Sequence, residues 1–170
     1  HTGNWEIAVL LLKRLNTPIN IVMFDGEHQQ LKQYLENTTG QRNANIIVIK
    51  DNISHIYQIM EALNNNELVC MHSDRFLPGN KTLQADFLGK AAHFPQGPFA
   101  LATKLNVPVT FVFAMKESFS HYHFFATPGV VYRNQPGISS EQILEAFVDE
   151  MTEKVKSYPA QWYNYYDFWK

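Results

Sequence analysis

The chain has 170 residues, with 14 Lys and Arg against 16 Asp and Glu, a formal net charge of −2 and 45% hydrophobic residues. This length and composition are typical of one globular domain with a single core. The small net charge, with no basic run, argues against a nucleic-acid partner, and the single cysteine, Cys70, excludes an internal disulfide framework.

Helical and extended patterns alternate through the first half of the chain. The predicted helices are residues 5–15, 28–36 and 53–63, where apolar side chains recur at helical spacing. A β-rich stretch follows each of them, at residues 19–24, 46–49 and 68–72. Helices that separate strands in this way predict βαβ units and a largely parallel sheet.

Residues 76–94 show no sustained period and contain Pro78, Gly79 and Gly89, so the sequence predicts a long loop there. Pro98 then suits the first position of a short helix that runs to Leu105, because its missing N–H would have no partner there.

A hairpin and a long helix are predicted next. Residues 107–115 and 122–126 are expected to be strands joined by a polar turn, which makes the sheet mixed. Ser139 is expected to cap the last helix, and Tyr158-Pro159 to end it. The apolar stripe of this helix is Ile143, Leu144, Phe147, Val148, Met151 and Val155. The predicted fold is a single α/β domain, residues 1–170, with a central mixed, mostly parallel sheet flanked by helices.

The start of the first helix carries a candidate general base. His1 and Glu6 are separated by four residues and straddle a Gly-Asn turn, so their side chains can meet. A carboxylate bonded to one ring nitrogen fixes the tautomer and raises the basicity of the other nitrogen, as a base acting on a hydroxyl requires. The alternative is an ordinary helix start, because so short a motif arises easily by chance.

Four separated blocks carry a family resemblance: residues 1–6 (HTGNWE), 73–75 (SDR), 87–102 (FLGKAAHFPQGPFALA) and 158–162 (YPAQW). In this order and spacing, the chain resembles the late acyltransferases of lipid A biosynthesis, of the lauroyl and myristoyl type, from its first residue to its last. These belong to the lysophospholipid acyltransferase superfamily. The resemblance implies a glycerolipid acyltransferase-like catalytic domain, with His1 as general base and Glu6 as its partner in the family's His-x4-Asp/Glu motif.

Four residues are candidates for substrate binding: Arg42, Asp74, Arg75 and Gly97. The resemblance matches Arg42 to a functional arginine and Asp74 to the aspartate of the second block. Arginines, or N–H groups at a helix start, could hold a phosphate or the oxyanion of acyl transfer. Each residue also has a structural interpretation. Arg42 could be a solvated surface cation, Asp74 could only terminate its strand, and Gly97 could be required only by the backbone conformation.

Two expectations concern the shape of the site. Arg42 and Asp74 should face the same cleft as His1, since ligands of α/β sheets tend to bind outside the carboxyl ends of strands. The cleft should continue into an apolar acyl groove walled partly by residues 76–94, since each buried CH₂ of an acyl chain contributes about 0.8 kcal/mol.

Three other features have a structural interpretation. His121 and His123 could face one way and share a metal, but no third ligand is evident nearby, so we favour a non-metal role. Cys70 lies in an apolar stretch, where a thiol is inert. Residues 162–170 hold six aromatic side chains, which are typical of packing or of membrane interfaces, and we favour packing.

The sequence as a whole predicts an O-acyltransferase that moves a fatty acyl chain from an acyl carrier protein thioester to a hydroxyl of a membrane glycolipid, with no metal or other cofactor. The chain begins at His1 without an initiator methionine, so we expect a soluble fragment. The resemblance places the full-length protein at the cytoplasmic face of the bacterial inner membrane, in peripheral contact with it and with an upstream anchor. The open alternatives are acylation of a lysophospholipid or aminolipid, a lipid-binding module without turnover, and a thioesterase.

Overall fold

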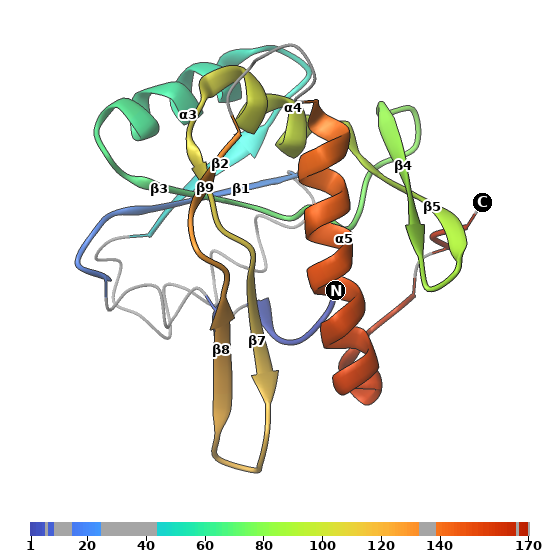
Figure 1. The fold of residues 1–170 in the computed structure, drawn as a ribbon. Helices are drawn as coiled ribbons and strands as arrows, with labels where there is room; N and C mark the ends of the chain where they lie inside the picture. The colour runs from blue at the N-terminus through green and yellow to red at the C-terminus, as the bar shows by residue number, and fades with distance from the viewer. Residues whose placement is uncertain (6, 9–14, 25–43, 133–138, 166, 170) are drawn as a thin grey trace. The chain divides into compact units, whose positions relative to one another are not determined.

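A computed structural model describes residues 1–5, 7–8, 15–24, 44–132, 139–165 and 167–169 of the chain (Figure 1). Two compact units are present: His1–Ala8 with Ser73–Lys170, and Val9–His72. Helices occur in both units, together with parallel strands in one and antiparallel strands in the other, so the predicted α/β class is confirmed. None of the described helices combines the length and the apolar character needed to cross a membrane.

The Val9–His72 unit contains a three-stranded parallel sheet in the order β2 (Ala44–Ile49), β1 (Ile19–Phe24), β3 (Leu68–Met71). Five of the six residues of β1 are buried, as expected for a central strand that is covered on both faces. Its polar exception, Asn20, donates from Nδ2 to Glu67 Oε2 at 2.8 Å, which compensates its burial. These strands confirm the predicted parallel pattern.

The helix α3 (Ser54–Asn64) lies between β2 and β3 in the chain and packs against both strands. It buries Ile59 and Ala62, three residues apart on one helix face. This confirms the helix predicted at residues 53–63. The helix predicted at residues 28–36 lies outside the described residues.

The core of the other unit forms around α5 (Ser140–Ser157), which packs against β4 (Thr82–Phe87) and α4 (Gln96–Leu105) (Figure 1). Ser139 occupies the N-cap position and Tyr158 follows the last helical turn, as predicted, but the Ser139 side chain makes no capping hydrogen bond. The Gln142 N–H donates instead to the Ser139 carbonyl at 3.2 Å. The apolar stripe is confirmed, because the following side chains are buried: Ile143, Leu144, Val148, Met151 and Val155. Phe147 completes it through ring contacts at 5.5–6.4 Å with four other phenylalanines of the core.

The long loop predicted for residues 76–94 is wrong over most of its length. β4 pairs antiparallel with β5 (Lys90–Pro95) through a two-residue turn, Leu88-Gly89. Both turn residues have positive φ, +56° and +83°, as a two-residue hairpin turn with the favoured twist requires. Asp86 Oδ1 accepts a hydrogen bond from the Gly89 N–H at 2.9 Å and fixes the turn.

The positive φ of Leu88 predicts the effect of a substitution in this turn on stability. Leu88 is 40% exposed and holds φ at +56°, where its side chain is strained and asparagine is tolerated. Leu88→Asn should therefore raise the free energy of unfolding by about 0.5–1 kcal/mol, measured by urea denaturation. Leu77→Asn is the matched control, since Leu77 is 49% exposed without a positive φ. A loss of stability in Leu88→Asn, or an equal gain in both variants, would contradict this reading.

Two predicted boundaries differ from the structure, at the start of α4 and in the strand expected at residues 107–115. α4 begins after Pro95, so Pro98 is its third residue and not its first, although it still lies in the first turn. β7 (Val112–Lys116) and β8 (Tyr122–Ala126) form the predicted hairpin. The strand expected at residues 107–115 is broken, because β6 (Pro108–Val109) pairs instead with β9 (Val130–Val131). Among the described residues, the strands thus form four separate sheets, one of three strands and three of two strands, and not one continuous sheet.

Candidate functional site

The first four residues lie between the C-terminal segment and β7. The Tyr163 N–H donates to the His1 carbonyl at 3.0 Å, and the Gly3 N–H donates to the Gln161 carbonyl at 2.9 Å. The Asn4 N–H donates to the Ala114 carbonyl of β7 at 2.8 Å. Hydrogen bonds to two distant parts of the chain therefore set the position of the His1 backbone.

Gly3 is required by this arrangement. Its φ is +71°, and a Cβ at this position would collide with the Ala114 carbonyl oxygen and lie 2.7 Å from Met115 Sδ. Only a residue without a side chain allows the two backbones to approach in this way.

Asn4 begins the helix predicted at residues 5–15. Its Oδ1 accepts the Ile7 N–H at 3.1 Å, as an N-cap side chain does, and its carbonyl accepts the Ala8 N–H at 3.2 Å. Trp5, Ile7 and Ala8 are helical. Glu6 lies outside the described residues, so its predicted contact with His1 stays a prediction.

In the structure, the imidazole ring of His1 contacts the carboxylate of Asp74. The Nδ1–H of His1 donates to Asp74 Oδ1 at 2.8 Å and lies 3.0 Å from Oδ2. Asp74 is 7% exposed, and the His1 side chain is 21% exposed. Because a carboxylate only accepts hydrogen bonds, Nδ1 carries the proton, and in the neutral ring the basic lone pair is on Nε2. We call these two residues the His1–Asp74 pair.

Arg75 reaches the same stretch of backbone. Its Nη2 donates to the Tyr163 carbonyl at 2.9 Å, and that carbonyl also accepts from the His1 backbone nitrogen at 3.2 Å. The Nε of Arg75 is buried and has no hydrogen-bond partner among the residues that the structure describes. The guanidinium therefore lies close to His1 and has a donor left for another group.

The C-terminal segment is held to β7 by Gln161. Its Oε1 accepts the Lys116 N–H at 2.7 Å, and its Nε2 donates to the Lys116 carbonyl at 2.7 Å. On the neighbouring residue, the Trp162 ring packs at 5.5 Å against Phe87 of the core. The preference for packing is thus confirmed for Trp162 and for Phe168, which is 2% exposed, whereas Tyr165 is 89% exposed.

Two other predicted site residues are not part of this arrangement. Arg42 lies outside the described residues, so its place in a shared cleft stays a prediction. Gly97 is the second residue of α4, not on the segments that carry the His1–Asp74 pair. A Cβ on Gly97 would meet no atom of the other described residues within 4 Å, apart from its own helix, so close packing against them does not require glycine there.

Comparison with known families agrees with the resemblance. Over residues 1–170, the chain matches the family model described as bacterial lipid A biosynthesis acyltransferase. The chain belongs to this acyltransferase family. No curated protein matches the chain. The predicted family and the predicted class of enzyme are therefore confirmed.

In this acyltransferase, His121 and His123 share one carboxylate that the sequence reading missed. Glu117 Oε1 lies 2.9 Å from His123 Nδ1, and its Oε2 lies 3.5 Å from His121 Nε2. The three side chains meet at the end of the β7–β8 hairpin and are largely exposed. No group of three or more His, Cys, Asp or Glu in the described part of the chain could hold a metal ion.

Cys70 of the acyltransferase provides a prediction about pH. Burial raises the pKa of its thiol from 9.0 to about 11, because the thiolate is poorly solvated there. At pH 8 its alkylation by iodoacetamide should be about 100-fold slower than that of a free cysteine, and should rise about tenfold per pH unit up to pH 10. Mass spectrometry of the alkylated protein measures the rate, and unfolding in guanidinium should remove the difference. Rapid alkylation of the folded protein at pH 8 would contradict it.

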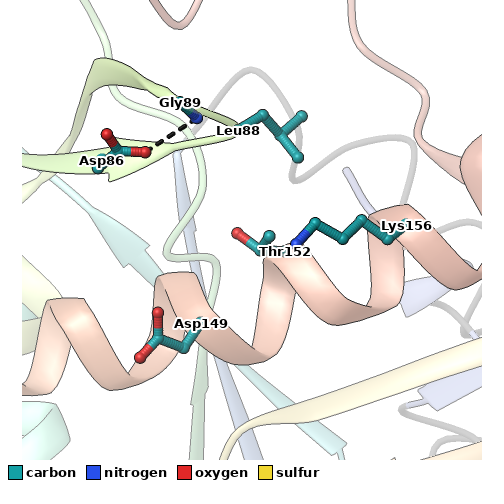
Figure 2. A pocket seen from close by; sticks show the side chains of 6 residues that line it. All are labelled: Asp86, Leu88, Gly89, Asp149, Thr152 and Lys156. Carbon is teal, nitrogen blue, oxygen red and sulfur yellow. Dashed lines mark hydrogen bonds between the residues drawn. The ribbon is translucent and has the colours of Figure 1, made fainter.

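A hollow of about 400 Å³ lies between the β4–β5 turn and α5 of the acyltransferase (Figure 2). Its lining is mixed, and the residues are Asp86, Leu88, Gly89, Asp149, Thr152 and Lys156. None of these is a predicted site residue, and two carboxylates and an ammonium group do not suit an acyl chain. Phe87 and Phe94, both 0% exposed, belong to the core and do not wall a groove. The acyl groove therefore stays a prediction.

Proposed function

We propose that this acyltransferase moves a fatty acyl chain from an acyl carrier protein thioester to a hydroxyl of a membrane glycolipid of the lipid A precursor type, with residues 1–170 as its catalytic domain. Family membership supports an acyl donor and a lipid acceptor in general. The observation that carries the proposal is His1, whose Nδ1 is held by Asp74 so that Nε2 can act as a base.

In the proposed reaction, His1 Nε2 takes the proton of the acceptor hydroxyl while the hydroxyl oxygen attacks the thioester carbonyl. A C–O bond forms and the carbonyl becomes a tetrahedral oxyanion. When the oxyanion collapses, the C–S bond breaks and the thiolate of the carrier leaves. The imidazolium then returns its proton to this thiolate, so the products are an ester and a free thiol.

The other predicted site residues have supporting roles in this proposal. Glu6 is the carboxylate of the His-x4-Glu motif, and Arg42 and Gly97 remain candidate substrate contacts. Arg75 has the firmest support, because its Nε is a buried donor with no partner in the described part of the chain, and its Nη2 donates to the carbonyl that also accepts from the His1 backbone nitrogen. Such a donor could stabilise the oxyanion or a phosphate of either substrate.

We place the full-length protein in peripheral contact with the cytoplasmic face of the bacterial inner membrane. The supporting observation is membership of a family that builds lipid A, a membrane glycolipid. Exposed aromatic side chains near the C-terminus, Tyr165 at 89% and Trp169 at 37%, are available for such contact.

The test is an assay of the full-length protein with an acyl-acyl carrier protein and, in turn, a lipid A precursor, a lysophospholipid, an aminolipid or no acceptor. Mass spectrometry follows the carrier, the lipids and free fatty acid. We expect one acyl chain to be added to the lipid A precursor. If only another lipid is acylated, that lipid is the acceptor and the lipid A precursor is not. If only free fatty acid forms, the protein is a thioesterase. Consumption of no thioester would indicate a binding module.

A further inference from the structure

We infer that the tip of the β7–β8 hairpin enters the interface of a lipid bilayer, with Phe119 as the inserted side chain. The hairpin tip is the three-residue stretch Ser118-Phe119-Ser120, and Figure 1 shows this turn at the free end of the hairpin. The inference deepens the proposed function and rests on it, because it requires an acceptor that lies in a membrane. The sequence suggested the C-terminal aromatic residues for such a contact, and not this hairpin.

Phe119 is the most exposed of the large hydrophobic side chains in the described part of the chain. It is 96% exposed, and the next, Tyr165, is 89% exposed. A single exposed apolar residue needs no explanation by itself. The inference therefore depends on three further observations: the closed backbone of the hairpin tip, the side chains next to the ring, and the connection of the hairpin to His1.

The backbone of the hairpin tip is closed by two hydrogen bonds to one acceptor. The His121 carbonyl accepts the Glu117 N–H at 2.9 Å and the Ser118 N–H at 3.3 Å. Phe119 is the middle residue of the closed turn, with a short serine on each side. Because the turn is already ordered, little backbone freedom remains to be lost when the ring enters a lipid surface.

The side chains next to Phe119 are of the kinds that proteins place where they meet a bilayer. Lys116 Nζ lies 5.8 Å from the centre of the Phe119 ring. Tyr122 pairs directly with Lys116 across the hairpin, so the two side chains share one face. An apolar ring at the tip, a tyrosine behind it and a lysine that can reach phosphate groups together form the pattern of an interfacial anchor.

The carboxylate nearest to the hairpin tip belongs to the opposite face. Glu117 Oε1 lies 2.9 Å from His123 Nδ1. Because successive residues of a strand alternate between faces, His123 points away from the face that Tyr122 shares with Lys116. Glu117 and its histidines are therefore not part of the contact, and the charge next to Phe119 is the ammonium group of Lys116. This charge suits a surface of anionic lipid headgroups.

The hairpin also carries the contacts that position His1. The Ala114 carbonyl accepts the Asn4 N–H, and Gln161 bonds both backbone groups of Lys116. The chain between Ala114 and Phe119 spans at most about 17 Å, since an extended chain rises about 3.4 Å per residue. Insertion of the hairpin tip thus keeps the segment that carries His1 close to the headgroups, where the hydroxyl of a membrane glycolipid lies.

The first measurement detects insertion in the full-length protein, in vesicles of phosphatidylethanolamine and phosphatidylglycerol. Ser120→Cys, in a Cys70→Ala protein free of other cysteines, is labelled with a nitrobenzoxadiazole fluorophore, so that Phe119 is kept. We expect a blue shift of the emission and quenching by phospholipids with a nitroxide near the headgroup. Phe119→Ser in the labelled protein should abolish both signals. A control label at Glu145→Cys, an exposed position of α5, should show neither.

The second measurement compares acyl transfer to the lipid A precursor in vesicles and in detergent micelles. Phe119→Ser should lower kcat/KM in vesicles by about tenfold, because an aromatic ring no longer leaves water. In detergent its kcat/KM should stay within about twofold of the wild type. Phe119→Trp should keep the activity in vesicles, since tryptophan suits the interface. Tyr57→Ser, which removes a 64% exposed ring from α3, is the matched control and should change neither value.

Three results would overturn the inference. They are a label at residue 120 that stays in water, insertion that survives Phe119→Ser, and equal losses of activity in vesicles and in detergent. The last of these would assign Phe119 to contact with a protein partner. A loss in Tyr57→Ser as large as that in Phe119→Ser would also overturn it, because the effect would not be specific to the hairpin tip. The insertion measurement needs no turnover, so a protein that inserts without acyl transfer would contradict the proposed function alone.

Discussion

Replacing His1 by alanine is expected to lower kcat by about 10²–10⁴-fold, because the substitution removes the proposed general base for the acceptor hydroxyl. The loss should appear in kcat more than in KM, since the imidazole acts on the reacting oxygen and not on the remainder of the lipid. Steady-state transfer from an acyl-acyl carrier protein to the lipid A precursor measures both constants in the full-length protein.

Two measurements make the result for His1→Ala interpretable. His121→Ala is the matched control, because the His121 side chain is 67% exposed at the end of the β7–β8 hairpin, and its kcat should stay close to that of the wild type. Thermal unfolding tests whether the loss of the His1 contact to Asp74 has destabilised the fold. Near-normal turnover by a folded His1→Ala protein would reject the general-base role.

Gly3→Ala should cause the largest loss of stability among single-methyl additions near the site. The added Cβ would collide with the Ala114 carbonyl and lie 2.7 Å from Met115 Sδ, and the position holds φ at +71°. Overpacking costs about 1–3 kcal/mol, and a left-handed alanine costs about 1 kcal/mol more. We therefore expect the free energy of unfolding to fall by about 2–4 kcal/mol in urea denaturation.

The control for this variant is Gly97→Ala in α4. Outside its own helix, a Cβ at Gly97 would meet none of the described atoms within 4 Å, so this second glycine should accept alanine with a change in stability below about 1 kcal/mol. Gly3→Ala should also lose activity, because the segment that it displaces carries His1. If Gly3→Ala were as stable as the wild type, the backbone of β7 would be able to move away from the added methyl group without a loss of stability, and the close packing argument would be wrong.

Strong periodicity explains which elements could be predicted. β1 is apolar except for Asn20 and is buried in the middle of a sheet, and α5 repeats its apolar residues along one face, so in each case local pattern and tertiary position agree. The β4–β5 hairpin could not be found in the same way. Its turn places Leu88, a residue that rarely adopts a positive φ, before Gly89, and the surrounding glycines and proline suggested a loop.

The candidate site was only partly predictable for a different reason. Motif order singled out His1 and Asp74 separately, but the bond between them joins residues 73 positions apart and depends on tertiary structure. No periodicity or spacing relates Gln161 to the backbone of Lys116, although that contact holds the C-terminal segment from which Tyr163 fixes His1. Composition showed only that this segment is aromatic.

We propose that this chain adds an acyl chain to a lipid A precursor through His1. The most direct test is mass spectrometry of the lipid A made by a strain that lacks the full-length gene, carrying either the wild-type gene or His1→Ala. We expect lipid A in the deleted strain to be lighter by one acyl chain, the wild-type gene to restore the mass, and His1→Ala not to restore it. Lipid A of unchanged mass in the deleted strain, or full restoration by His1→Ala, would contradict it.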